Sequence, residues 1–288
     1  MYDSVIIGSG PAGITAAIYM KRAGLNVVVI GKDDGALGKT NKVENYYGFE
    51  NPISGNELLE NGRKQAKRLG ITIVEDEVVL IEIIDNGFQI KTVNSSFEAK
   101  TALLATGADR QIPNIKGMKE YEGKGVSYCA ICDAFFYRNK KVAVLGSGNY
   151  AINEINTLLP VAASVTMITN GEKPIENRSS EIPIVEKKIR EVRGDESKIQ
   201  QIDFEDESNL NIDGLFIAVG VASSTALARK IGAMINGKNI VVNEKQQTNV
   251  PGLYAAGDCT GGILQISKAT YEGMKAGLDI IQYIKKTK

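Results

Sequence analysis

Residues 4–30 read SVIIGSGPAGITAAIYMKRAGLNVVVI, and this stretch decides the fold. Its apolar ends (4–7 and 27–30) predict two short strands, and the segment between them has a helical pattern that closes at Gly24. The turn 8–13, Gly8-Ser9-Gly10-Pro11-Ala12-Gly13, lies between the first strand and the helix, where a GxGxxG pattern is typical of dinucleotide binding. Glycines at such a turn let the backbone approach a diphosphate, which rests on the free N–H groups of the helix N-terminus. Residues 4–30 therefore predict a βαβ unit with a phosphate-binding turn.

One residue that usually accompanies this turn is missing. An acidic side chain at the end of the second strand commonly holds the ribose hydroxyls of a bound dinucleotide. That position falls at about Gly31 in this sequence. We therefore expect either another group at the ribose or a lower affinity.

A second unit of the same kind begins at Lys141. The segment KVAVLGSGNYAINEINTLLP (141–160) again places a glycine-rich turn, Gly146–Ala151, between a strand and a helix, and SVTMIT (164–169) supplies the next strand. Further strands are expected at 103–107, 216–220 and 253–258. This order predicts an α/β protein with two doubly wound domains, the second inserted in the first. The expected boundaries are 1–114 plus 239–288 for the first domain and 115–238 for the second.

A cysteine pair lies just before the second unit, in YCAICDAFF (128–136). The chain has three cysteines and no histidine, so a structural zinc site with four Cys or His ligands cannot be completed. Cys129 and Cys132 could still belong to an unusual metal site or be an inert pair, but a redox pair is the favoured interpretation.

Composition argues against several classes of partner. With 34 basic and 34 acidic residues the formal net charge is zero, which predicts no global attraction to nucleic acid or to a membrane surface. Apolar runs are of strand length, and the first strand begins by Ser4, which leaves no room for a signal peptide. We therefore expect a cytoplasmic, reducing setting, where a CxxC pair is more often catalytic or metal-binding than a permanent crosslink.

Five ordered segments together resemble the low-molecular-weight thioredoxin reductases. They are GSGPAG (8–13), VENYYGF (43–49), LLATGA (103–108), GVSYCAICDAFFYRNKKVAVLGSGN (125–149) and VPGLYAAGDC (250–259). The resemblance implies two Rossmann-like domains, with FAD in the first and a redox disulfide in the second. By position it implies that FAD is held by Gly8, Ser9, Gly10, Pro11, Ala12, Gly13, Gly31, Lys32, Gly38, Asn45, Ala105, Thr106, Gly107, Asp258, Gln265 and Ile266.

The resemblance also assigns the chemistry of the second domain. Cys132 would face the flavin, Cys129 would attack the disulfide of thioredoxin, and Asp133 would be the acid–base group. A helix-capping aspartate is the simpler alternative for Asp133. A helix N-terminus at the pair would stabilise a thiolate. The third cysteine, Cys259, is expected to be a buried apolar residue rather than a redox group.

The second glycine-rich turn departs from the family pattern for NADPH. Where the family carries a His-Arg-Arg run, this chain has Thr169-Asn170-Gly171-Glu172-Lys173, which offers no arginine fork for a 2′-phosphate. Tyr150 replaces a small Ser or Thr at the turn, and residues 221–224 replace a Pro-Asn turn. These departures predict that nicotinamide binding has been lost; an atypical NADH or NADPH site is the alternative.

Without a nicotinamide donor, electrons must come from another source. FAD can accept electrons singly, which suits ferredoxin, and the sequence resembles the ferredoxin-dependent flavin thioredoxin reductases in keeping the CxxC pair without the NADPH signature. A non-enzymatic redox sensor is a further alternative. Candidate docking cations, each of which could instead be an ordinary solvated charge, are Lys64, Lys67, Arg68, Arg138, Lys140, Lys141, Lys285, Lys286 and Lys288.

Two last expectations rest on the resemblance alone. The family forms homodimers, and its inserted domain rotates about two linkers so that the disulfide can meet both the flavin and the protein substrate. In this sequence the linkers would lie near Ile112–Gly117 and Asn236–Asn243.

Overall fold

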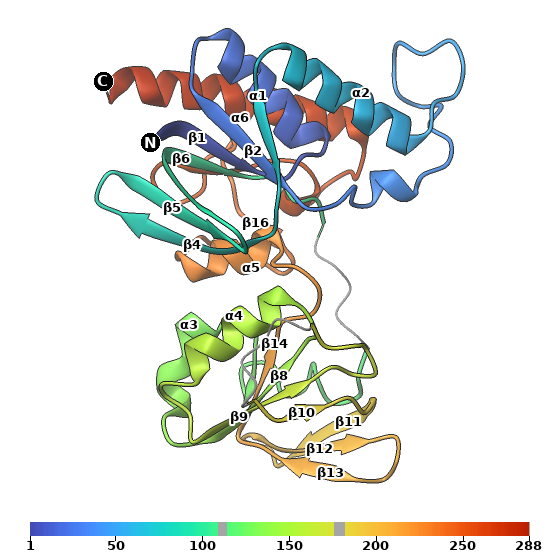
Figure 1. The fold of residues 1–288 in the computed structure, drawn as a ribbon, viewed down its shortest axis with the longest axis vertical. Coiled ribbons are helices and arrows are strands. Elements are labelled where there is room, and N and C mark those ends of the chain that lie inside the picture. Colours follow the sequence, from blue (N-terminus) through green and yellow to red (C-terminus); the bar gives the residue numbers. More distant parts are fainter. Residues whose placement is uncertain (109–113, 176–181, 288) are drawn as a thin grey trace. The chain divides into compact units, whose positions relative to one another are not determined.

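The computed structural model describes residues 1–108, 114–175 and 182–287. The chain folds into two compact units, both of α/β type (Figure 1). The first unit consists of Met1–Asp109 with Ser223–Lys288, and the second of Arg110–Ala222. The predicted fold class is therefore confirmed, with one unit inserted in the other.

The first unit is built on a mixed sheet whose parallel strands run in the order β3-β2-β1-β6, with β17 also pairing with β6. β4 and β5 extend the sheet as an antiparallel meander from the first part of β6. Most of β1 and β2, all of β17 and the second half of β6 are buried, in agreement with the apolar runs there. The strands of this sheet are β1 (Tyr2–Ile7), β2 (Val27–Gly31), β3 (Thr72–Glu75), β4 (Val78–Ile84), β5 (Gly87–Thr92), β6 (Ser96–Leu104) and β17 (Leu253–Ala255).

Three long helices group together beside this sheet (Figure 1): α1 (Pro11–Arg22), α2 (Gly55–Arg68) and α6 (Ile266–Lys286). α1 and α6 approach closely because Gly273 of α6 faces the α1 backbone. A Cβ built on Gly273 would lie 2.1 Å from the Ala12 carbonyl oxygen. α2 begins with a serine cap, in which the Ser54 hydroxyl accepts a hydrogen bond from the Glu57 amide at 3.1 Å. Two 3₁₀ turns, η1 (Leu37–Lys39) and η3 (Asp258–Thr260), complete this side.

The chain returns to the first unit at Ser223, rather than at the expected residue 239. The reason is that α5 (Ser224–Lys230) already packs with this unit: Ser224 hydrogen bonds to Thr106, and Lys230 donates to the Val79 carbonyl oxygen at 3.3 Å. Residues 236–243, the expected second linker, overlap the hairpin of β15 (Ile235–Asn236) and β16 (Asn239–Ile240). Of the expected first linker, residues 112 and 113 lie outside the described part of the chain.

The second unit contains a parallel sheet in the order β10-β9-β8-β14-β7 and a small antiparallel sheet in the order β11-β12-β13. Its helices are short, and α3 comprises a single turn that continues into the 3₁₀ helix η2. Its elements are β7 (Val126–Ser127), α3 (Ala130–Asp133), η2 (Ala134–Tyr137), β8 (Lys141–Leu145), α4 (Asn149–Leu158), β9 (Ser164–Ile168), β10 (Ile184–Val185), β11 (Ile189–Gly194), β12 (Ile199–Phe204), β13 (Asn209–Asn211) and β14 (Gly214–Ile217).

No helix in the described ranges is both long enough and apolar enough to cross a bilayer.

Candidate functional site

Most of the predicted cofactor residues gather at one edge of the first unit's sheet. Ile7 is in register with Ile30 and with Leu104, and Leu104 is in register with Ala255. Because these strands are parallel, their carboxyl ends lie side by side, which is where open α/β sheets bind ligands. The residues at or just after these four strand ends include Gly8, Gly31, Ala105 and Asp258.

The turn between β1 and α1 needs glycine at two positions for steric reasons. A Cβ on Gly8, which has φ of 120°, would lie 2.1 Å from the Ala105 carbonyl oxygen, and one on Gly13 would lie 2.0 Å from the Gly8 carbonyl oxygen. Gly10 differs, because a Cβ there would meet no atom within 4 Å. Gly10 is also the N-cap of α1 and has no side chain to bond the first amides of the helix. The turn thus presents open backbone at a helix N-terminus, as diphosphate binding requires.

The packing around Gly31 explains why no acidic residue lies at the end of β2. A Cβ on Gly31 would lie 2.4 Å from the Ser9 hydroxyl oxygen, so an Asp or Glu at position 31 would displace the phosphate turn. Lys32, a predicted cofactor residue, is ion-paired with Glu77 at 2.6 Å. Gly38 packs against the Asp34 side chain, where a Cβ would lie 2.4 Å from the Asp34 Cβ.

Sequence reasoning missed a basic residue at this turn. Arg63, on α2, donates from Nη2 to the Ser9 hydroxyl at 3.2 Å and pairs through Nη1 with Asp34 at 2.6 Å. The Arg63 side chain is only 21% exposed. No local motif surrounds it, so only the tertiary fold could reveal its position.

The structure joins two pairs of segments that are far apart in the sequence. Asn45 donates a hydrogen bond to the Gln265 amide oxygen at 2.9 Å, which unites two predicted cofactor residues. Thr106 is bonded to Ser224, with the two hydroxyl oxygens 2.8 Å apart, and each residue's amide donates to the other's hydroxyl. Ser224 was not predicted as part of this edge.

Asp258 opens the turn η3 between β17 and α6, which begins at Ile266. Burial raises the pKa of Asp258, and the nearby Lys268 partly opposes that shift. Lys268 donates to the Gly257 carbonyl oxygen at 2.8 Å and pairs with Glu272 at 3.0 Å, so two unpredicted charged residues hold this turn. A half-buried carboxyl with a perturbed pKa at a strand end is typical of a ligand site.

Cys259, the next residue, is buried as predicted. Cys259 is only 1% exposed, and its thiol donates to the Leu104 and Ala256 carbonyl oxygens at 3.5 and 3.4 Å. Burial raises the pKa of the Cys259 thiol to about 12, which leaves it unreactive at neutral pH.

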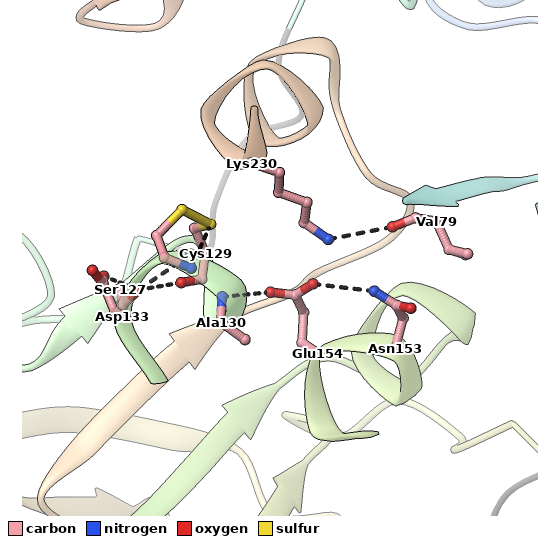
Figure 2. The surroundings of a disulfide bond; sticks show 9 residues. Val79, Ser127, Cys129, Ala130, Asp133, Asn153, Glu154 and Lys230 are labelled. Carbon is pink, nitrogen blue, oxygen red and sulfur yellow. Dashed lines mark hydrogen bonds between the residues drawn. A yellow bond between two sulfur atoms is a disulfide. The ribbon is translucent and has the colours of Figure 1, made fainter. Parts of the chain in front are cut away.

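In the second unit Cys129 and Cys132 form a disulfide, with their Cα atoms 5.3 Å apart (Figure 2). The pair is therefore bonded to itself rather than arranged as a metal clamp. Cys129 is buried and Cys132 is exposed. Cys129 is also the N-cap of α3, since its Sγ accepts from the Cys132 amide at 3.3 Å.

Because Cys129 caps α3, Asp133 does not have the helix-capping role that was the simpler alternative for it. The Asp133 carboxylate caps neither α3 nor η2; it accepts a hydrogen bond from the Ser127 hydroxyl at 2.7 Å. The same hydroxyl accepts from the Cys129 amide at 3.1 Å. Ser127 thus connects the carboxylate to the backbone of the first cysteine and holds Asp133 close to the disulfide.

A second carboxyl group that sequence reasoning missed lies beside the disulfide. Glu154, on α4, is only 2% exposed, and its Oε2 accepts from the Ala130 amide at 2.7 Å. Figure 2 shows Glu154 between Ala130 and Asn153, which donates to its Oε1 at 3.4 Å. A buried carboxyl is costly unless it is hydrogen bonded, so this contact anchors the single-turn α3 to the longer helix.

The second glycine-rich turn has the same backbone geometry as the first but different surroundings. A Cβ on Gly146 would lie 2.2 Å from the Ala218 carbonyl oxygen, just as a Cβ on Gly8 would lie close to the Ala105 carbonyl oxygen. However, the Ile175 amide donates to the Ser147 carbonyl oxygen at 2.9 Å, so the segment after β9 lies against this turn. The Tyr150 ring is buried at the start of α4, and Glu172 is exposed in the position expected for a cation.

A family model for pyridine nucleotide-disulphide oxidoreductases matches residues 2–273. The chain belongs to this family. Within the family it is similar over its length to thioredoxin reductases: that of Aquifex aeolicus is 36% identical over 302 residues, covering 99% of this chain and 94% of the relative. The thioredoxin reductase of Ureaplasma parvum is also 36% identical over 302 residues, covering 99% and 97%.

Two solved structures of the family are similar to this fold. The atypical thioredoxin reductase TRi from Desulfovibrio vulgaris Hildenborough has a TM-score of 0.93 and 40% identity, covering 99% of both chains. A ferredoxin–flavin thioredoxin reductase from Clostridium acetobutylicum has a TM-score of 0.75 and 33% identity, covering 99% of this chain and 98% of its own. The chain is thus a thioredoxin reductase family member, and these enzymes are FAD-dependent disulfide oxidoreductases.

The residues at the sheet edge fit the cofactor that the family implies. The open Gly10 backbone suits the diphosphate of FAD, and the Gly8 and Gly13 contacts leave room only for glycine. By contrast, no group of three or more His, Cys, Asp or Glu side chains in residues 1–108, 114–175 and 182–287 is arranged to hold a metal ion.

Proposed function

We propose that the protein is a ferredoxin-dependent flavin thioredoxin reductase, which passes electrons from reduced ferredoxin through FAD and the Cys129–Cys132 disulfide to thioredoxin. The reductase activity follows from the family, and the proposal concerns the electron donor and the roles of individual residues.

The observation that carries the choice of donor is the contact that the segment after β9 makes with the second turn. A dinucleotide bound in the family manner needs its diphosphate at Gly148, but the Ile175 amide is bonded to the adjacent Ser147 carbonyl oxygen and the Tyr150 ring is packed at the same helix start. The exposed Glu172 carboxylate would also repel a 2′-phosphate. Similarity to a ferredoxin–flavin enzyme of 33% identity supports the same choice.

The residues that would hold FAD are those at the carboxyl edge of the first sheet, from Gly8–Gly13 to Gln265 and Ile266. When bound, FAD supplies the ability to accept electrons one at a time and to release them as a pair, which a one-electron protein donor requires. The half-buried Asp258 and the Asn45–Gln265 pair lie on segments that meet at this edge.

The cysteines carry the exchange with thioredoxin. Once the disulfide is reduced to two thiols, the thiolate of Cys129 attacks one sulfur of the thioredoxin disulfide, and a mixed disulfide forms as the other thioredoxin sulfur leaves. The thiolate of Cys132 then attacks Cys129 Sγ, restoring the disulfide and releasing reduced thioredoxin. We assign Asp133, which the Ser127 hydroxyl holds beside the disulfide, as the acid–base group that would accept and return the proton of the thiols.

Two exposed aromatic residues beside the disulfide suit a protein substrate. Phe135 is 73% exposed and Phe136 is 67% exposed, with their ring centroids 6.1 Å apart, and Ile131 between the cysteines is 49% exposed. Exposed apolar side chains that cluster in this way mark interaction surfaces. We assign this surface to thioredoxin.

The predicted docking cations for ferredoxin remain part of the proposal. Arg138 lies 5.8 Å from the Phe135 ring centroid and Lys140 lies 5.7 Å from that of Tyr137, so both stay on the surface near the disulfide segment. Lys288 lies outside the described residues. The proposal also includes a homodimer, which sedimentation equilibrium would test.

A coupled assay tests the donor. Anaerobic holoprotein is mixed with oxidised thioredoxin and with ferredoxin that is continuously reduced by light, and thioredoxin thiols are counted over time. Turnover that depends on ferredoxin and is abolished in C129S supports the proposal. Turnover with NADPH or NADH alone would assign an atypical nicotinamide site instead, and no turnover with any donor would favour a redox sensor.

A further inference from the structure

The Gly8–Gly13 turn is accompanied by a cation whose position no motif explains. Arg63 is reached 54 residues after Ser9, yet its guanidinium bonds to the Ser9 hydroxyl at 3.2 Å. Ser9 itself is nearly buried, at 6% exposed, and lies between two glycines of the phosphate turn. The guanidinium is therefore fixed beside the backbone that receives the diphosphate.

Asp34 fixes the same guanidinium from the other side. Its carboxylate lies 2.6 Å from Arg63 Nη1, while Nη2 is directed to Ser9. The Asp34 side chain is half exposed and the Arg63 side chain is 21% exposed. Two contacts on different nitrogens hold the planar fork in one orientation, which lowers the entropy lost when the remaining N–H groups bind an anion.

A second cation at this edge is directed elsewhere. Lys32 follows β2 directly, but it is ion-paired with Glu77, whose side chain is only 3% exposed. The end of β2 also has no acid, because any side chain at Gly31 would collide with Ser9. The usual means of holding the adenosine half of a dinucleotide is thus absent, and Arg63 with Asp34 lies beside the same turn.

We propose that Arg63 binds the adenosine-diphosphate half of FAD, with Asp34 and Ser9 positioning its guanidinium. The guanidinium offsets the negative charge of the diphosphate through charge-assisted hydrogen bonds, and Asp34 replaces the missing acid at the end of β2. This inference rests on FAD as the cofactor and is independent of which protein or nucleotide donates the electrons.

The test measures cofactor release rather than activity. Holoprotein is diluted to nanomolar concentration, and the rise in flavin fluorescence gives the rate of FAD release and the dissociation constant. We expect R63A to weaken FAD binding about 10- to 100-fold, the range for a lost charge-assisted contact. D34N should weaken it less, by about 3- to 10-fold, because Arg63 is then present but mispositioned.

Matched variants separate binding from folding. Lys64, the next residue on α2, is 70% exposed and pairs only loosely with Glu60 at 3.8 Å, so K64A should change the FAD dissociation constant by less than about twofold. Exchange of bound FAD for FMN, which lacks the adenosine half, should be favoured in R63A relative to wild type. R63K should recover only part of the loss, because one ammonium group cannot make both contacts.

Three outcomes would overturn the inference. One is a folded R63A whose FAD affinity is within twofold of wild type. Another is equal weakening of FAD and FMN, which would make Arg63 a purely structural tie between α2 and the segment after β2. The third is an effect of K64A as large as that of R63A, which would indicate general charge rather than a specific contact.

Discussion

Gly10 and Gly148 occupy the same position in two turns that both begin Gly-Ser-Gly and open a helix, and the atoms around them differ. Above Gly10 there is open space, and a guanidinium is bonded to the neighbouring Ser9. A Cβ on Gly148 would lie 3.5 Å from the Gly220 carbonyl oxygen, and the neighbouring Ser147 carbonyl oxygen accepts a hydrogen bond from the Ile175 amide. A glycine-rich motif therefore specifies a backbone shape, while the segments that fold against it decide whether a dinucleotide can bind.

The comparison is tested most strongly by placing one methyl group in each turn. G10A should reduce FAD affinity by at least about 100-fold, because the new Cβ occupies the space where the diphosphate would rest on α1. G148A should leave flavin content and ferredoxin-linked turnover within about twofold, because that turn holds no ligand in our account. Flavin-to-protein ratios after gel filtration measure the first effect. Loss of flavin in both variants would contradict the comparison.

A second prediction concerns the chemistry that the inserted unit retains. D133N should lower turnover about 100-fold, the usual scale for losing a general acid or base, while the disulfide still forms. S127A should show a smaller loss, since Ser127 only connects Asp133 to Cys129. Thiol counts before and after reduction check that the disulfide is intact. Wild-type turnover of the D133N variant would show that Asp133 has only a structural role.

A third prediction isolates what the two turns share. G8A and G146A should each destabilise the protein by about 2–5 kcal/mol, because each Cβ would meet a carbonyl oxygen at close range and each residue adopts a positive φ. Urea unfolding of the holoprotein measures this. A large effect in one turn with none in the other would mean that their backbones differ more than their geometry indicates.

A fourth prediction follows from α4, which begins at the second turn but supports the disulfide. E154A should cost about 1–3 kcal/mol, because the Ala130 amide loses a buried partner. E154Q keeps an acceptor at the same place and should recover most of that loss. An E154A variant as stable as the wild type would show that Glu154 does not anchor α3.

The smallest effect is expected at Cys259. With its pKa raised to about 12 by burial, only about one thiol in 10,000 is ionised at pH 8. Iodoacetamide should therefore modify the exposed Cys132 of reduced, folded protein and leave Cys259 unmodified, with labelling of Cys259 rising as the pH approaches 12 or on unfolding. C259S should retain activity within about twofold. Rapid labelling of Cys259 at pH 8 would contradict its inert role.

The sequence predicted those features that local patterns encode. The βαβ units, the glycine positions and the buried Cys259 follow from apolar periodicity and short motifs, because strands, helices and tight turns depend on neighbouring residues. Arg63, Glu154 and Ser224 were missed because their partners lie 54, 24 and 118 residues away. The return at Ser223 was missed for the same reason, since α5 is held by contacts that no local pattern marks.

The most direct test of the account is anaerobic flavin absorbance at 450 nm. Purified holoprotein is mixed in separate experiments with millimolar NADPH, millimolar NADH and an excess of reduced ferredoxin. We predict rapid bleaching with ferredoxin and unchanged absorbance over minutes with either nicotinamide. Bleaching by NADPH or NADH within seconds would show that the second turn still serves a dinucleotide and would contradict the account.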